Sequence, residues 1–176
     1  MTTPMHPQPD AVSNKADAKA RFLETYRREY ATTKRVLDAF PAEQGDFKPH
    51  ETSNSAKGLL GTFIAEGHLA LRALRGEQMF GAGMPKPPES WDELRAALDA
   101  MQRETEAEVA KASPDLAGTV AFPKGPKQMG EYSVEDFLWF MLHDHIHHRG
   151  QLSVYLRMVG AKVPSIYGPS KDEPWT

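Results

Sequence analysis

Apolar residues recur along this chain at helical spacing in four segments. The pattern predicts helices over residues 14–40, 56–74, 91–111 and 134–159. No strand-like alternation of apolar and polar positions competes with this interpretation. Amphipathic helices of this length bury their apolar faces against one another, so the sequence predicts an all-α fold, a four-helix bundle.

Helix boundaries are marked by capping residues. Ser90 and Ser133 stand immediately before the third and fourth predicted helices, and each is followed three residues later by a carboxylate, Glu93 and Asp136. This is the spacing of a capping box, in which the serine hydroxyl and the carboxylate satisfy free backbone N–H groups. Gly160 follows the fourth helix and is a good residue for a left-handed C-terminal cap.

The connections are rich in proline and glycine. Residues 113–130 predict a long loop with at most a minor hairpin around the short apolar piece Val120 to Phe122. Residues 1–13 are polar and proline-bearing, which is typical of a disordered lead-in. We therefore expect a single domain over residues 14–176, ending in an irregular tail around residues 163–170.

Composition narrows the function classes. The chain has 176 residues, 40% of them hydrophobic, and no apolar run approaches the roughly 18 residues of a membrane span. No signal-peptide core is visible at the start, and the absence of cysteine is compatible with the cytoplasm. The formal net charge is −3 and the basic residues are scattered, so we expect neither a membrane nor a nucleic-acid partner.

Histidines gather inside the fourth predicted helix. Four of the chain's seven lie within residues 143–148. Residues four apart lie one above the other on a helix, which stacks His143 over His147 and Asp144 over His148. Imidazole and carboxylate are the usual ligands of zinc, nickel and iron(II). The segment is therefore a candidate metal site.

The helical phase separates the two pairs. On a projection at 100° per residue, Asp144 and His148 fall within the apolar stripe, whereas His143 and His147 fall at its edge and His145 lies to one side. A carboxylate in an apolar stripe is costly unless it is paired or binds a cation. Asp144 and His148 are thus the favoured inward pair, either as metal ligands or as a pair hydrogen-bonded to each other or to a neighbouring helix.

A third ligand has to come from another helix, because two side chains do not complete a metal site. The second predicted helix offers Glu66 and His68. Glu66 lies beside the apolar positions of that helix, and His68 lies further round. A solvated position at the rim of the bundle is the alternative for either residue.

The segment His147-His148-Arg149-Gly150-Gln151-Leu152-Ser153-Val154-Tyr155-Leu156-Arg157 resembles the last helix of the DinB-like (YfiT-like) superfamily of metal-dependent hydrolases and thiol transferases. The tail at residues 163–170 resembles that of one branch of it. The resemblance implies a four-helix bundle of up-down-down-up topology, and it implies a homodimer.

The resemblance also implies a ligand set, from which this chain departs twice. The superfamily uses one histidine on the second helix and two on the fourth. The later of these matches His148, but Asp144 stands at the earlier position and Thr62 at that of the second helix. Either Glu66, one turn after Thr62, completes the site, or the site moves to His143 and His147, or it has been lost.

The leading hypothesis is a small metal-dependent enzyme, acting on a small-molecule substrate by hydrolysis or by transfer of a low-molecular-weight thiol. The divalent ion would be zinc, nickel, manganese or iron. Arg149 would bind an anionic group of the substrate or form a surface or interface ion pair, and Gln151 would hydrogen-bond His147. The alternative is a non-catalytic dimeric helix-bundle protein whose Asp/His cluster is structural and binds no metal.

Overall fold

The protein is described by a computed structural model over residues 18–80 and 83–175. Its elements are α2 (Ala18–Ala39), the short 3-10 helix η1 (Ala42–Gln44), α3 (Ala56–Arg75), α4 (Trp91–Lys111), β1 (Thr119–Gly125), β2 (Gln128–Ser133) and α5 (Val134–Met158). All four predicted helices are confirmed, and each end that falls on described residues lies within one residue of its predicted place. Residues 14–17 of the first predicted helix and the lead-in over residues 1–13 lie outside the described part.

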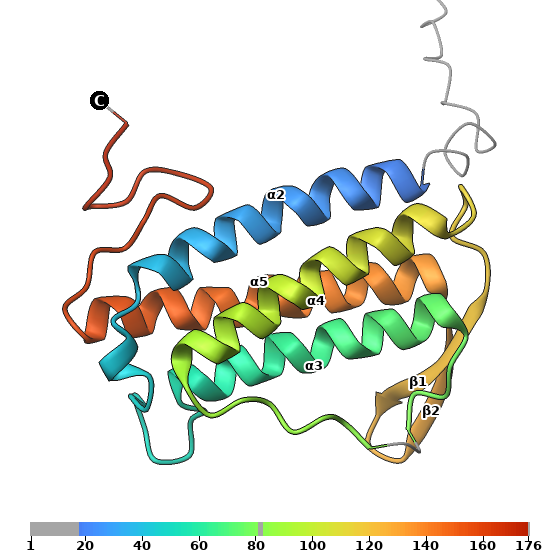
Figure 1. Ribbon diagram of the computed structural model, residues 1–176, viewed down its shortest axis with the longest axis horizontal. Helices are drawn as coiled ribbons and strands as arrows, with labels where there is room; N and C mark the ends of the chain where they lie inside the picture. Colours follow the sequence, from blue (N-terminus) through green and yellow to red (C-terminus); the bar gives the residue numbers. More distant parts are fainter. Residues whose placement is uncertain (1–17, 81–82, 176) are drawn as a thin grey trace, which may run out of the picture.

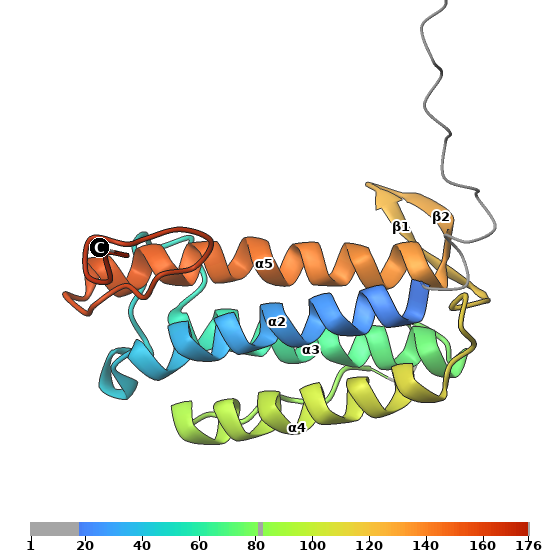
Figure 2. The same ribbon diagram turned by 90° about the horizontal axis from the view of Figure 1, so that it is seen from above.

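The four long helices form a bundle of up-down-down-up topology. In Figure 1, α2 and α5 run from right to left, while α3 and α4 run from left to right. The segment between the parallel helices α3 and α4 therefore returns along the whole length of the bundle (Figure 1). Helix α3 packs against α4 and α5, α5 packs against α2, and the contact between α2 and α4 is looser. Figure 2 shows α5 along one edge of the bundle and α4 along the other.

Both expected capping serines act as caps. The Ser90 hydroxyl accepts a hydrogen bond from the Glu93 backbone N–H, and the Ser133 hydroxyl accepts one from that of Asp136. These bonds satisfy donors that a helix N-terminus otherwise leaves free. The start of α5, the helix with the histidine cluster, is therefore fixed by its own sequence.

The region over residues 113–130 is more ordered than predicted. Strands β1 and β2 pair antiparallel from Thr119 opposite Ser133, and β2 continues directly into α5. Val120 is buried, and the Phe122 ring meets Phe137 of α5 edge-on at 5.0 Å between ring centroids. The apolar piece seen in the sequence is the anchor of this hairpin, because its alternate side chains pack on the N-terminal part of α5.

The hydrophobic core is divided into two clusters along the bundle. Phe137 and Met141 of α5 belong to one cluster, together with Phe22 of α2, while Leu152 and Leu156 of α5 belong to the other. Between them, residues 143–151 bring polar side chains to the middle of the helix. The histidine segment consequently lies at mid-height of the bundle, between two apolar clusters that hold the helices together.

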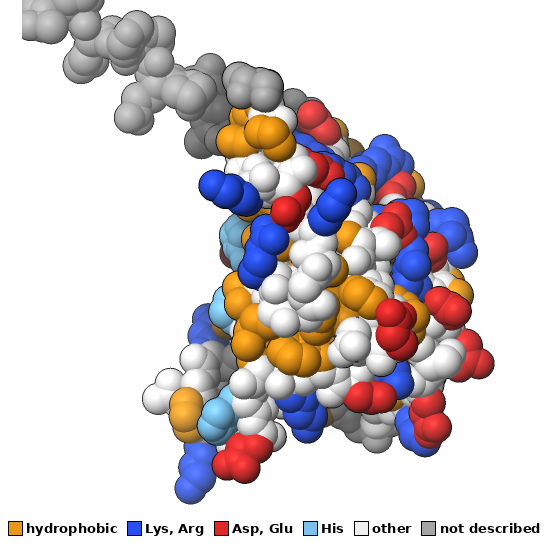
Figure 3. All heavy atoms as spheres, turned by 90° about the vertical axis from the view of Figure 1, so that its left-hand side faces the viewer, with side chains coloured by type: hydrophobic (Ala, Val, Ile, Leu, Met, Phe, Trp, Pro, Cys, Tyr) orange, Lys and Arg blue, Asp and Glu red, His pale blue; other side chains and the backbone are white. Residues whose placement is uncertain are grey.

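Two observations concern the surface. None of the helices that the structure describes is both long enough and apolar enough to cross a membrane. On the end face drawn in Figure 3, basic and acidic side chains are intermingled around a central group of hydrophobic ones, without a continuous basic surface.

Candidate metal centre

Glu66 of α3 and the pair Asp144 and His148 of α5 meet between the two helices. One ligand atom of each residue lies within 4.8 Å of the other two. His148 Nδ1 is 2.8 Å from Glu66 Oε1 and 3.8 Å from Asp144 Oδ1. Within the described residues this is the one group of three or more such side chains close enough to hold a metal ion, and it does not include His68.

The three side chains differ in their exposure. The Glu66 side chain is 7% exposed, that of His148 17% and that of Asp144 39%. The helical projection places Asp144 within the apolar stripe of α5. In the structure the residue lies at the edge of that stripe, where α5 meets α3, and its side chain is partly exposed. The cluster is therefore closed on the Glu66 side and open to solvent on the Asp144 side.

The charges of the cluster call for a cation. Burial, together with the negative charge of Asp144, raises the pKa of Glu66 to about 9. Glu66 Oε2 is buried and has no hydrogen-bond partner. A buried, unpaired carboxylate oxygen next to a second carboxylate is destabilising unless a proton or a metal ion neutralises it. Two carboxylates and an imidazole are suitable donors for a divalent ion, so the residues present fit one.

His145 is not part of this ligand group, but it stands directly behind it. Its ring packs against Phe63 at 4.3 Å between centroids, its Nε2 is 2.9 Å from Thr33 Oγ1, and its Nδ1 is 3.7 Å from Glu66 Oε2. Burial, reinforced by the positive charge of Arg149, lowers the pKa of His145 to about 3. The imidazole is therefore neutral, and the projection that set it aside missed its contact with Glu66.

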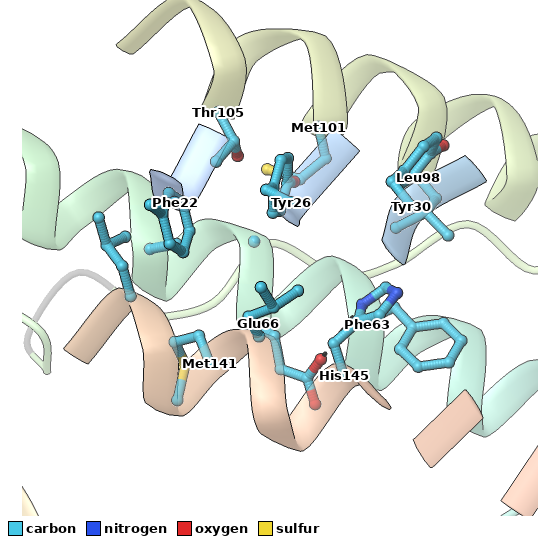
Figure 4. A pocket seen from close by; sticks show the side chains of 14 residues that line it. Phe22, Tyr26, Tyr30, Phe63, Glu66, Leu98, Met101, Thr105, Met141 and His145 are labelled. Carbon is cyan, nitrogen blue, oxygen red and sulfur yellow. Dashed lines mark ion pairs between the residues drawn. The ribbon is translucent and has the colours of Figure 1, made fainter. Parts of the chain in front are cut away.

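A small cavity lies next to Glu66 and His145, between all four helices. Figure 4 shows these two side chains on one side of it, with Tyr26 of α2 and Met101 and Thr105 of α4 on the other. Its volume is about 30 Å³, room for one or two water molecules. The cavity lies at the loose contact between α2 and α4, and Asp144 is not among the residues that line it.

The alternative ligands considered from the sequence are not brought together. His143 and His147 are both exposed and belong to no ligand group among the described residues. His147 instead lies 2.9 Å from the Gln151 amide, the contact expected from their spacing. The Thr62 hydroxyl donates to the Gly58 carbonyl of its own helix and is not part of the cluster.

Arg149 corrects a prediction. The expected surface or interface ion pair is instead a buried one, since the arginine is 1% exposed and donates to Glu29 Oε2 at 2.8 Å and to the Glu29 carbonyl at 2.9 Å. Tyr167 of the tail donates to the same carboxylate. Although burial opposes it, these hydrogen bonds from Tyr167 and Arg149 lower the pKa of Glu29. Arg149 thus joins α5, α2 and the tail, and it does not face the cluster.

Comparison with known proteins bears on the family and the fold of this chain. The model of the DinB family matches residues 12–175. The chain belongs to the DinB family. A crystal structure of the DinB-like protein YjoA from Bacillus subtilis superposes with a TM-score of 0.66 at 18% identity, over 81% of this chain and 94% of that one. A crystal structure of a DinB-like protein from Bacillus cereus ATCC 10987 superposes with a TM-score of 0.65 at 21% identity, over 83% of this chain and 95% of that one. At these identities the two structures support the fold alone.

A curated relative matches a short segment. The uncharacterized protein YrdA of Bacillus subtilis (strain 168) is 50% identical over 36 residues, which is 20% of this chain and 22% of that protein. The match therefore spans about a fifth of the relative's length.

Proposed function

We propose that this DinB-family protein is a metal-dependent enzyme whose divalent ion is held by Glu66, Asp144 and His148. The observation that carries the proposal is the convergence of these three side chains from two helices, with ligand atoms within 4.8 Å of one another. The buried Glu66 Oε2, which lacks a hydrogen-bond partner, supports it further, because such an atom in a folded protein calls for an ion or a proton.

The donor set favours particular metals and chemistry. Two carboxylates and one imidazole suit zinc, manganese or iron(II) better than copper, and nickel is a further candidate. Three protein ligands leave coordination positions open, at which a bound metal lowers the pKa of a water or a thiol. The half-exposed Asp144 lies where a small substrate can approach. Hydrolysis and transfer of a low-molecular-weight thiol are the two reactions that fit.

Metal stoichiometry tests the site. Purified protein is stripped with a chelator, dialysed against zinc, nickel, manganese or anaerobic iron(II), and analysed for metal. We expect about one equivalent per chain, retained in a His143→Ala/His147→Ala control and lost in Asp144→Ala and His148→Ala. Protein without stoichiometric metal under any of these conditions sinks the proposal, and loss of metal in the control moves the site to the exposed histidines.

Cobalt substitution separates the two reactions. A thiolate bound to cobalt(II) gives an intense near-ultraviolet charge-transfer band, which a bound water or hydroxide does not give. We expect this band on adding a low-molecular-weight thiol if the protein is a thiol transferase. If the spectrum stays unchanged with every thiol, hydrolysis is the remaining reaction.

A structural role is the second candidate, and one observation favours it. His148 Nδ1 and Glu66 Oε1 are 2.8 Å apart and form a hydrogen bond that joins α5 directly to α3. A purely structural cluster predicts that replacing Asp144 and His148 together by apolar residues leaves thermal stability equal or higher, whereas losing one partner alone destabilises. A metal-dependent rise in melting temperature that disappears in Asp144→Ala excludes this role.

A further inference from the structure

We propose that His145 is a positioning residue of the metal centre, which donates a hydrogen bond from Nδ1 to Glu66 Oε2 and so holds Glu66 in place to bind the cation through Oε1. The inference rests on the proposed metal site. It concerns a residue that belongs to no ligand group and that the helical projection set aside.

The position of the imidazole is fixed from two sides. Its ring lies against Phe63 of α3, and its Nε2 is 2.9 Å from Thr33 Oγ1 of α2. With the ring held in this way, Nδ1 faces Glu66 Oε2 across 3.7 Å, so a small rotation of the carboxylate is enough to reach hydrogen-bond distance. His145 therefore connects three helices at the point where Glu66 needs support.

Glu66 has a specific need for this donor. A carboxylate that binds a metal through one oxygen leaves the other to be satisfied by the protein, and Oε2 has no hydrogen-bond partner in the described structure. As a metal ligand Asp144 cannot serve, because a carboxylate that binds a cation only accepts hydrogen bonds. The His145 imidazole, whose Nδ1 lies 3.7 Å from Oε2, can present an N–H to it.

Thr33 allows His145 to carry its proton on Nδ1. A neutral imidazole with N–H at Nδ1 needs a donor for Nε2, and the Thr33 hydroxyl can supply it. That hydroxyl now donates to the Glu29 carbonyl at 3.1 Å, but Arg149 Nη1 donates to the same carbonyl at 2.9 Å. The carbonyl therefore keeps a partner when the Thr33 hydroxyl turns to His145, and no buried group is left unpaired.

Three substitutions of His145 distinguish a side chain that positions Glu66 by a hydrogen bond from one that only fills space. In His145→Asn the amide nitrogen replaces Nδ1, whereas in His145→Gln it replaces Nε2. His145→Leu fills the space without any donor. Zinc affinity is measured by competition calorimetry on the full chain, with the exposed His147→Leu as a control. We expect His145→Leu and His145→Gln to weaken zinc binding roughly 10–100-fold, and His145→Asn to weaken it less than about threefold, as for other residues that support metal ligands.

A variant at a second position keeps the inference testable if the His145 variants fold poorly. Thr33→Val keeps the shape of the threonine and removes the hydroxyl that supports the Nδ1–H form. We expect it to weaken zinc binding as well and to shift the cobalt(II) absorption spectrum, while His147→Leu changes neither.

Three outcomes decide between the alternatives. If His145→Leu binds zinc like the wild type and His145→Asn binds it worse, the residue only fills space and the inference is overturned. Equal affinities of all variants overturn it too, while the metal site stands. If the wild-type protein itself binds no zinc or cobalt, the proposed function fails, and this inference fails with it.

Discussion

Glu66 concentrates the chemistry of the candidate centre in one side chain. Its Oε1 accepts from His148, its Oε2 faces His145, and Asp144 adds negative charge beside it. In the metal-free protein its raised pKa means that the folded chain holds a proton that the unfolded chain releases at a lower pH. Glu66 is therefore a proton site in the metal-free protein and, in the proposed function, a metal ligand.

The pH dependence of stability follows from this. Burial and Asp144 raise the Glu66 pKa from 4.5 to about 9, so its stabilisation is fully present below about pH 4.5 and is lost as the pH rises through 9. Glu66→Gln should abolish that loss, because an amide stays neutral. We expect the variant to gain on the wild type as the pH rises, by at most about 1.4 kcal/mol per pH unit, in urea unfolding with chelator present. If the difference in free energy of unfolding between Glu66→Gln and the wild type is constant from pH 5 to 9, the raised pKa of Glu66 is contradicted.

The buried ion pair of Arg149 gives a second prediction at this scale. Arg149→Met leaves the Glu29 carboxylate buried without its main partner, so we expect a loss of about 3–5 kcal/mol in the free energy of unfolding. Arg157 is the matched control: its ion pair with Asp172 lies at the surface, with its own side chain 51% exposed. Arg157→Met should cost less than about 1 kcal/mol. If both variants lose the same free energy of unfolding, the buried ion pair of Arg149 does not stabilise the fold more than a surface pair.

The sequence predicted some of these residues and not others. Asp144 and His148 followed from their spacing on one helix, and Glu66 followed from its place one turn after Thr62. The roles of His145 and Arg149 could not be read in the same way. Both depend on α2, which supplies Thr33 and Glu29, and the pattern of one helix does not say which residues of another it faces.

At the scale of elements, the packing of α3 on α4 depends on one small residue. A Cβ built on Gly67 would overlap Met101 Cγ, whereas one on Gly150 of α5 meets nothing within 4 Å. We expect Gly67→Ala to lower the free energy of unfolding by about 1–3 kcal/mol through overpacking. Gly150→Ala should raise it by about 0.5–1 kcal/mol, because alanine favours a helix. Chemical denaturation measures both, and a stabilising Gly67→Ala would mean that α4 is not packed there.

Elements were more predictable than contacts. Helix periodicity and the capping serines are local properties, so α3, α4 and α5 ended within a residue of their predicted places. The hairpin was underestimated because its strands are stabilised by packing on α5, as the contact of Phe122 with Phe137 shows, and not by their own pattern. Tertiary contacts of this kind are absent from a single sequence.

At the scale of the whole molecule, the topology creates the site. The up-down-down-up order places α3 beside α5, so a carboxylate from the second helix of the bundle meets the histidine segment of the last. The same order leaves one side of α5 at the edge of the bundle (Figure 2). Membership of the DinB family accounts for this frame.

The expected homodimer remains a prediction, and α5 offers a surface for it. Its exposed positions recur with spacings of three and four residues, at Phe140, His143, His147, Gly150 and Val154. This is the repeat at which two helices pack along their length. Acidic residues in the first turn of α5 and a basic residue in its last turn suit an antiparallel pair.

A matched pair of substitutions tests this surface. Val154 on the α5 stripe and Phe80 outside it are each 57% exposed. We expect Val154→Glu to convert a dimer into monomers in sedimentation velocity, because it places a charge in the helix seam, and Phe80→Glu to leave the dimer intact. A wild-type protein that sediments as a monomer contradicts the prediction of a dimer.

An anomalous difference map from crystals of the zinc-loaded protein, recorded on both sides of the zinc absorption edge, tests directly whether Glu66, Asp144 and His148 bind a metal ion. We expect one strong peak between Glu66 of α3 and the pair Asp144 and His148 of α5, with an oxygen or nitrogen of each at about 2.0–2.2 Å from it. A peak at His143 and His147, or no peak in crystals grown with excess zinc, would contradict this expectation.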